Sequence, residues 1–214
     1  MKKIDLSTWE RKRQYELFRS YTFPHFSLTV RLDITEFVEM AKAEKISRFN
    51  AVLFAVMKAA NNIPEFRTRF HQEQIVEYDI VHPSYTVPIA NDHFAFCDAE
   101  YSNDWATFDR NCRHSSEQAR AQPELADNAA ETQHWIYTSC TPWLDFSAAT
   151  HPVANADDCI PRIAWGKITN DRDRWHLPVN LQVHHALMDG FHAGKFYEYL
   201  EKNLTGFKAD NITS

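Results

Sequence analysis

The sequence predicts an α+β fold with a large mixed, mostly antiparallel sheet and helices packed against it. Short stretches in which apolar and polar residues alternate, such as residues 26–35, are typical of half-buried strands. Stretches with apolar residues at helical spacing separate them, as in residues 48–63. The 214 residues contain no repeat, low-complexity tract or Pro/Gly-rich linker. We therefore expect one domain over residues 1–214.

The N-terminal elements follow from capping residues and alternation. Ser7 or Thr8 is suited to cap a helix, and an amphipathic segment follows, so we expect a helix within residues 5–20. Residues 26–35 alternate and predict a strand, and a second helix is expected over residues 36–45.

The central part combines a buried helix with short strands. Residues 48–63 are apolar nearly all round, which predicts a buried helix. Residues 74–89 are predicted to form two strands separated at His82–Pro83, and residues 93–101 a further strand. The polar stretch 102–133 is predicted to be helical.

The C-terminal part contains the longest strand. Residues 134–143 are predicted to form a strand that ends at Pro142. Residues 161–185 indicate a hairpin with a polar turn at 169–172, and the last helix is expected over residues 191–203.

Composition excludes several functional classes. The chain has only four glycines, so a Gly-rich phosphate loop is not expected. Its formal net charge is -6, which argues against a nucleic-acid partner. The four cysteines are widely spaced and support neither a zinc site nor a disulfide framework. Because there is no signal peptide and no apolar run long enough for a membrane span, we expect a cytoplasmic protein.

Two adjacent histidines end the longest predicted strand. Val179, Leu181 and Val183 mark one face of this strand, so His185 lies on that face and His184 on the other. Neighbouring strand residues cannot easily share an ion, so no metal site is expected. An imidazole held at a rigid strand end suits general-base chemistry, and His185 is therefore the candidate base.

An aspartate follows this histidine pair closely. Asp189 either orients the imidazole of His185 directly or braces the turn between them. A carboxylate buried near a sheet edge also needs a cation, and Arg11 and Arg13 are the candidates.

The stretch HHALMDGFH, residues 184–192, resembles the HHxxxDGFH signature of the chloramphenicol acetyltransferases. The segments WERKRQYELF, FSLTVRLDIT, IPEFRTRF, VHPSYTV and SCTPW resemble further family segments in the same order. The resemblance covers nearly the whole chain. It implies the coenzyme A-dependent acyltransferase fold, a two-layer sandwich of a large mixed sheet and flanking helices. It also implies a homotrimer with active sites between subunits.

The resemblance implies a role for each motif residue. His185 would deprotonate the acceptor hydroxyl, whose oxygen attacks the acetyl thioester directly, with no acyl-enzyme. Ser139 would donate a hydrogen bond to the tetrahedral oxyanion, a contribution of about 3 kcal/mol. Asp189 would be structural and pair with the arginine that aligns with Arg11. The sequence agrees for Ser139, because a serine between two aromatics and a Pro-Trp corner is held firmly.

Acetyl-CoA is the cosubstrate that the resemblance implies, and no metal is needed. Lys167 and Arg48 match or lie near the family's phosphate-contacting cations, and Pro142 would lie against the adenine. A solvated surface charge is the ordinary alternative for each cation.

The acceptor pocket departs from the family. By resemblance it is lined by Phe18, Phe26, Phe94, Ala149, His151, Val153 and Ala164. The family usually has an aromatic at the position of Ala149, an aliphatic at His151 and a threonine at Ala164. Such changes are worth about 1–3 kcal/mol of acceptor binding. Chloramphenicol or a related hydroxyl compound is the expected acceptor.

Other interpretations remain open. The acyltransferase cores of 2-oxo acid dehydrogenase complexes share HHxxxDG, but that interpretation requires an upstream lipoyl domain and linker. A relative that acetylates another hydroxyl compound, or binds amphiphilic steroid-like ligands without drug acetylation, is a further alternative. Retention of His185, Ser139, Asp189 and Arg11 favours an enzyme.

Overall fold

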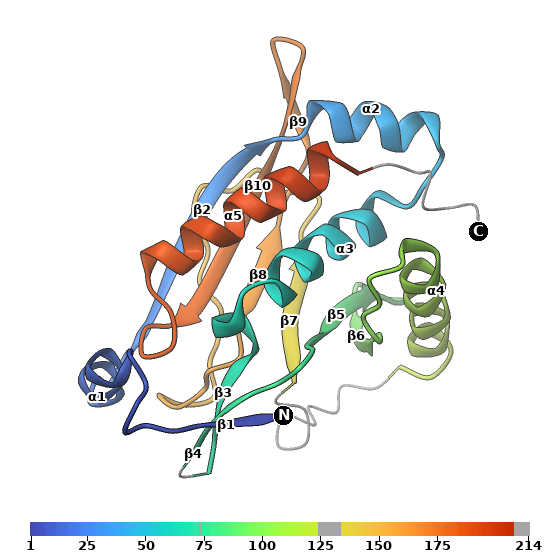
Figure 1. Ribbon diagram of the computed structural model, residues 1–214. Helices are drawn as coiled ribbons and strands as arrows, with labels where there is room; N and C mark the ends of the chain where they lie inside the picture. The colour runs from blue at the N-terminus through green and yellow to red at the C-terminus, as the bar shows by residue number, and fades with distance from the viewer. Residues whose placement is uncertain (73, 124–133, 208–214) are drawn as a thin grey trace.

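A computed structural model describes residues 1–72, 74–123 and 134–207, and these form a mixed α+β architecture (Figure 1). The large sheet has seven strands within these residues, in the order β2-β10-β8-β7-β5-β6, with β9 paired to β10. Its strands are β2 (His25–Asp33), β5 (His82–Pro88), β6 (Phe94–Asp98), β7 (Trp135–Cys140), β8 (Arg162–Trp165), β9 (Thr169–Asp171) and β10 (Arg174–His184). Among the strand pairings of the described residues in this sheet, β5–β7 and β7–β8 are parallel and the others antiparallel, which confirms the predicted mixed, mostly antiparallel sheet.

A smaller sheet and the helices complete the described part. The three-stranded sheet has the order β1-β4-β3. Its strands are β1 (Lys2–Ile4), β3 (Thr68–His71) and β4 (Gln74–Glu77). The helices are α1 (Lys12–Arg19), α2 (Thr35–Ala43), α3 (Arg48–Asn61), α4 (Trp105–Ala121) and α5 (Gly190–Thr205), with a short 3-10 helix η1 (Pro64–Arg67).

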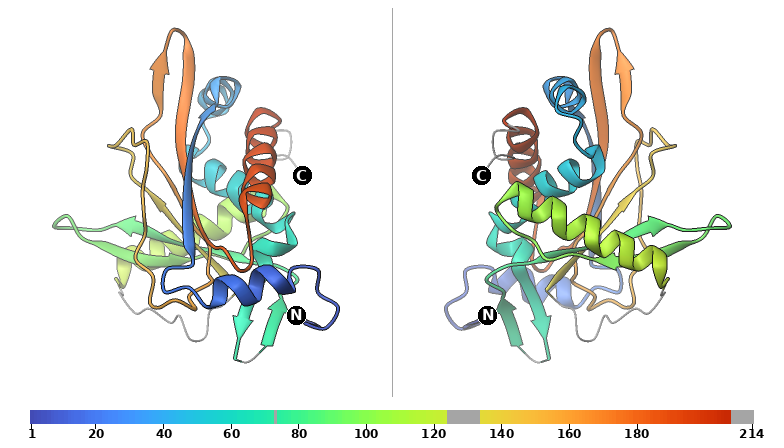
Figure 2. Two further views of the ribbon diagram at one scale, coloured as in Figure 1. Left: turned by 90° about the vertical axis from the view of Figure 1, so that its left-hand side faces the viewer. Right: turned by 90° about the vertical axis from the view of Figure 1, so that its right-hand side faces the viewer.

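Helices α2, α3 and α5 lie against one face of the large sheet, and Figure 2 shows this layered arrangement from the side. Between the two layers is the main hydrophobic core, to which β10 contributes Val179, Leu181 and Val183 and α5 contributes Phe196 and Leu200. Alternate strand residues point to opposite faces of a sheet. The β10 residues between these three, Asn180 and Gln182, therefore point away from the helices.

Helix α3 is the buried helix that the sequence predicts. Ser47 accepts a hydrogen bond from the backbone N–H of Asn50 and so caps its first turn. Ten of its 14 residues are buried, because it runs under the sheet and also contacts α4 and α5. Its starting residue, Arg48, is exposed and is one of the predicted cofactor-binding cations.

The first helix begins later than its sequence predicts. The Ser7 and Thr8 hydroxyls bond to Asp5 instead of capping a helix, and the chain makes a turn before α1 begins at Lys12. Asp5 accepts from both the backbone N–H and the hydroxyl of Ser7, which is a local bond that competes with helix formation. As a result Arg11 lies just ahead of the helix.

Two strand boundaries also differ from prediction. The break within residues 74–89 falls at 78–81, and His82–Pro83 begins β5, because proline is tolerated at the start of a strand. The tight turn of the long hairpin is formed by Arg172 and Asp173, with φ of 50° and 65°. It joins β9 to β10, so the predicted turn at 169–172 is placed too early.

A second hydrophobic cluster lies where β10 ends. Ala186 and Leu187 are fully buried there against Phe70 of β3, and Trp9, Tyr15 and Phe18 pack on the cluster from the N-terminal segment. The two residues that follow His185 are therefore packed into this cluster, which anchors the chain just after the histidine.

Candidate active site

The candidate base, His185, directly follows the last residue of β10. Its ring stacks on Phe18 with a centroid distance of 3.8 Å and contacts Phe26 at 4.8 Å. Its backbone N–H donates to the carbonyl of Pro24 over 2.8 Å. Nδ1 is buried without a hydrogen-bond partner in the described part of the chain. Nε2 makes no hydrogen bond within the described residues, so this nitrogen is the one available to a ligand.

The neighbouring His184 is structural. Its Nε2 lies 2.9 Å from the carbonyl of Ala156, and its Nδ1 accepts from the backbone N–H of Ala186. Both ring nitrogens of a neutral imidazole are thereby used. Burial lowers the pKa of His184 to about 4, with further lowering from His25. The two adjacent histidines therefore lie on opposite faces, as the alternation predicts, and have different surroundings.

Asp189 braces the turn after the histidines rather than contacting the base. It is the N-cap of α5 and accepts from the backbone N–H of Phe191 over 3.0 Å. Its other oxygen accepts from Nη1 of Arg11 over 2.7 Å, which selects Arg11 over Arg13 as its partner. Nδ1 of His192 lies 2.9 Å from Asp189.

The ion pair keeps this carboxylate charged. Burial opposes ionisation, but the hydrogen bond from Arg11 and the nearby His192 lower the pKa of Asp189 to about 2. The Arg11 side chain is only 13 % exposed, and its Nε and Nη2 have no partner in the described part of the chain. Asp189 is therefore the hydrogen-bonded counter-ion of Arg11 within these residues, and the carboxylate of Glu65 contributes a further electrostatic attraction.

Ser139 lies in β7 and opens onto a cavity of about 830 Å³. The cavity extends from Ser139 to Arg48 and Lys167, and its walls include Pro142 and the exposed ring of Trp143. The predicted oxyanion donor and all three predicted cofactor-binding residues thus share one cavity. Neither cation forms an ion pair with the described residues, so both are available to an anion.

Gly166 and Cys140 are two further residues of this cavity that sequence reasoning did not select. A Cβ at Gly166 would collide with the carbonyl of Leu144, so only glycine lets the 141–145 segment approach the end of β8. Burial raises the pKa of the Cys140 thiol to about 11, so it stays protonated at neutral pH and is not an activated nucleophile. His93 also lines the cavity, from the turn between β5 and β6.

The side chains of Ser139 and His185 are not close to each other within one chain. The register places Ser139 beside Ala164 and Ala164 beside Asn180, which faces away from the helices. His185 follows the opposite alternation, and it lies five positions beyond Asn180, about 17 Å along the strand. The two predicted catalytic side chains are thus on different faces of the sheet.

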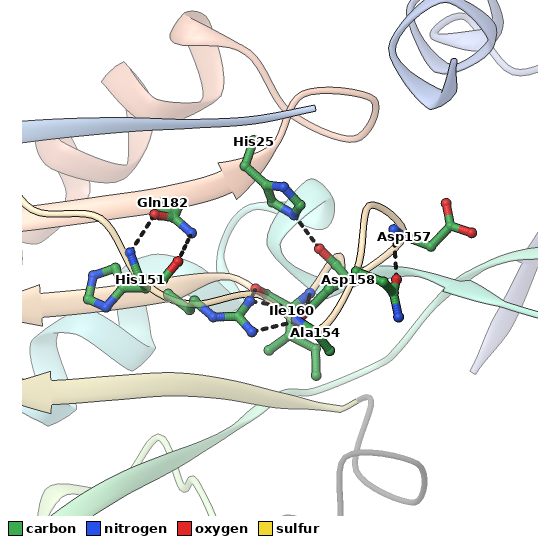
Figure 3. A network of polar contacts seen from close by, with 9 residues as sticks. His25, His151, Ala154, Asp157, Asp158, Ile160 and Gln182 are labelled. Atoms are coloured by element: carbon green, nitrogen blue, oxygen red, sulfur yellow. Dashed lines mark hydrogen bonds and ion pairs between the residues drawn. The ribbon is translucent and has the colours of Figure 1, made fainter. Parts of the chain in front are cut away.

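The sheet face that carries Ser139 is polar. Beside Asn180 and Gln182 of β10 lies the 149–151 segment, where the carbonyl of Ala149 accepts from Asn180 over 3.1 Å. His151 bonds to Asn180 through its ring and to Gln182 through its backbone. Figure 3 shows the Gln182–His151 contacts from close by. His151 is therefore a hydrogen-bonded residue of this face rather than a free imidazole.

A second cavity, of about 620 Å³, adjoins this polar face. Val153 lines it, together with Tyr137 and Arg162, which sequence reasoning missed. Strand alternation points to both residues, because Tyr137 lies two positions before Ser139 and Arg162 two positions before Ala164, on the same face of the sheet. No group of three or more potential metal ligands occurs in the described ranges.

The predicted acceptor residues fall into separate groups in one chain. Phe18 and Phe26 flank His185, whereas Phe94 lines the cavity of Ser139. Ala149 and His151 lie on the polar face, and Val153 lines the second cavity.

The chain matches the family model described as chloramphenicol acetyltransferase over residues 1–201. It belongs to the chloramphenicol acetyltransferase family. A chloramphenicol acetyltransferase from Escherichia coli is 32 % identical over 202 residues, covering 93 % of this chain and 91 % of that relative. The chloramphenicol acetyltransferase 3 of Escherichia coli is 28 % identical and covers 94 % and 95 %. Membership makes this chain an acyltransferase.

Solved structures agree with the family assignment. A chloramphenicol acetyltransferase superposes with a TM-score of 0.86 at 31 % identity, covering 94 % of this chain and 98 % of that one. The dihydrolipoamide acetyltransferase of Azotobacter vinelandii gives 0.67 at 18 % identity, which shows a shared fold alone. The family's acetyl-transferring members favour an enzyme over a protein that only binds amphiphiles. Within the described residues no helix is long and apolar enough to cross a membrane.

Proposed function

We propose that the chain transfers the acetyl group of acetyl-CoA to a hydroxyl of chloramphenicol or a close analogue. The observation that carries the proposal is the cavity that joins Ser139 to Arg48 and Lys167 in a member of this family. Its volume of about 830 Å³ lies in the range of sites for elongated small ligands. Arg48 and Lys167, which form no ion pair with the described residues, would compensate the phosphates of coenzyme A. Pro142 and Trp143 offer apolar surface to its adenine and pantetheine.

The chemistry is a direct transfer. Nε2 of His185 takes the proton of the acceptor hydroxyl, whose oxygen attacks the thioester carbonyl. The hydroxyl of Ser139 donates a hydrogen bond to the oxyanion that forms. The tetrahedral intermediate then expels the coenzyme A thiolate, which takes the proton back from His185 and leaves as the free thiol. The high pKa of Cys140 is consistent with a route without an acyl-enzyme.

The active site is proposed to form between copies of the chain, in a homotrimer. The support is geometric: one chain holds Ser139 and His185 on opposite sheet faces, so a second copy must bring its imidazole to the Ser139 cavity. The ring of Phe23, two residues before β2, is 85 % exposed on a single copy, as expected of an apolar side chain that a partner covers. We also propose a cytoplasmic location, where acetyl-CoA is available.

Thiol release from acetyl-CoA in the presence of chloramphenicol tests the proposal. The wild type is expected to turn over, and His185→Ala to lose about 10⁴-fold in kcat, in the upper range for removal of a general base. His93→Ala tests the alternative base, because His93 is an imidazole that lines the Ser139 cavity within one chain. Loss of activity in His93→Ala with full activity in His185→Ala would refute the assignment of the base.

A further inference from the structure

The second cavity adjoins the predicted reaction centre. Tyr137 and Arg162 form the row of side chains next to that of Ser139 and Ala164, on the same face of the sheet. Two residues along a strand span about 7 Å, so an acceptor whose hydroxyl lies at Ser139 reaches this cavity with its far end. Its volume of about 620 Å³ can hold a substituted aromatic ring.

A buried ion pair forms one wall of this cavity. Arg162 donates to both oxygens of Asp158, over 3.1 Å and 2.6 Å, and both side chains are 10 % exposed. The Arg162 guanidinium also donates to the carbonyl of Ile160 and lies 5.3 Å from the ring centroid of Tyr137. Figure 3 shows Asp158 at the centre of the contacts that shape this loop, with Ala154 and His25 bonded to it.

The charges of the cavity cancel in pairs. Arg19 and Asp157 also line this cavity and are paired to each other over 3.1 Å. Burial opposes the ionisation of Asp158, but its hydrogen bonds from Arg162 hold its pKa below the usual range, so the pair stays charged. An ionic ligand group would have to compete with a satisfied pair. An uncharged group with strong hydrogen-bond acceptors can share the guanidinium donors without breaking it.

We propose that Arg162 and Asp158 determine acceptor specificity, and that this cavity takes an aromatic end bearing an uncharged hydrogen-bond-accepting substituent such as a nitro or sulfonyl group. The inference rests on the proposed acetyl transfer. An aromatic ring would pack against Phe70 and Tyr137, and its substituent would face Arg162. The wall formed by Arg162 and Asp158 is polar. A purely hydrophobic acceptor end would need an apolar wall there and is therefore disfavoured.

The test compares chloramphenicol with its analogue in which hydrogen replaces the nitro group. In the wild type kcat/KM is expected to favour the nitro compound by about tenfold or more, the effect of one hydrogen bond to a charged group. The double variant Arg162→Met with Asp158→Leu removes both charges together and is expected to abolish this preference through KM. Lys202→Met with Glu198→Leu removes an exposed ion pair of α5 and is the matched control.

A second variant covers the case in which the double variant does not fold. Val153→Phe fills the cavity and is expected to raise KM for chloramphenicol about tenfold or more, with KM for acetyl-CoA unchanged. An unchanged nitro preference in a folded double variant, or an unchanged KM in Val153→Phe, overturns the inference and leaves acetyl transfer intact. Absence of turnover with either acceptor in the wild type overturns the proposed function itself.

Discussion

Removing Asp189 is expected to destabilise the protein more than removing Arg11, although the two form one ion pair. Asp189 has three contacts to lose: Nη1 of Arg11, the backbone N–H of Phe191 and Nδ1 of His192. Arg11 has a single hydrogen bond among the described residues, and two of its nitrogens are buried without one. Asp189→Ala therefore leaves a mostly buried cation without a hydrogen-bonded counter-ion among the described residues, with Glu65 as its remaining electrostatic partner. Arg11→Ala, in contrast, leaves a carboxylate that still has hydrogen-bond partners.

The expected losses in the free energy of unfolding follow from the lost helix cap and from the burial of the ion pair. Loss of the N-cap costs about 1 kcal/mol. Breaking a fully buried ion pair costs about 3–5 kcal/mol, and because the Asp189 side chain is 33 % exposed we reduce this to about 2 kcal/mol. Asp189→Ala is thus expected to lower the free energy of unfolding by about 3 kcal/mol and Arg11→Ala by about 1–2 kcal/mol. The double variant should be no less stable than Asp189→Ala, because it removes the stranded cation.

Urea unfolding followed by tryptophan fluorescence measures these differences, at one fixed protein concentration so that assembly does not confound them. The kcat of each variant that remains folded should fall with its stability loss, since Asp189 fixes the turn after His185. Equal costs for the two single variants, or a double variant whose loss is the sum of both, would show that the cation is not stranded and would refute this reasoning.

Three further outcomes are expected. Ser139→Ala should lower kcat by about 10²–10³-fold with little change in either KM, as for loss of one oxyanion donor; a change in KM alone would contradict that role. Lys167→Met should raise KM for acetyl-CoA about tenfold with kcat retained, in initial-rate assays, because one charge-assisted phosphate contact is lost; an unchanged KM would place the phosphates elsewhere. The pKa of His184 is lowered to about 4 in the folded state, against about 6.5 unfolded, so the unfolded chain binds more protons between these values. The contribution of neutral His184 to the free energy of unfolding is therefore complete above pH 6.5, and about 2–3 kcal/mol of it is lost as the pH falls towards 4. Urea unfolding at pH 7 and at pH 4.5 measures this loss, which should be smaller in His184→Gln than in the wild type. An equal loss in the two proteins would contradict the assignment.

Alternation in the sequence was sufficient to predict the strands that build the site. It placed His184 and His185 on opposite faces, and the structure gives them different surroundings for that reason. Boundaries failed where side chains bond locally or where the backbone takes a rare conformation. Asp5 holds the hydroxyls of Ser7 and Thr8, and the turn at 172–173 uses left-handed backbone without glycine.

The cavities could not be predicted from one sequence. Tyr137 and Arg162 are 25 residues apart in the chain and become neighbours only through the β7–β8 register. The ion pair of Arg162 with Asp158 depends on the fold of the 152–160 loop, which has no regular periodicity to interpret. The expected helix at 102–133 is confirmed as α4 up to Ala121, while residues 124–133 lie outside the described part.

The most direct test of the account is complementation between two inactive variants. His185→Ala and Ser139→Ala are refolded separately and as an equimolar mixture, and thiol release with chloramphenicol is measured for each. If Ser139 and His185 of different copies complete one site, mixed assemblies contain some sites with both residues intact, and the mixture recovers a substantial fraction of wild-type activity. A mixture no more active than the mean of its two components would contradict a site shared between copies.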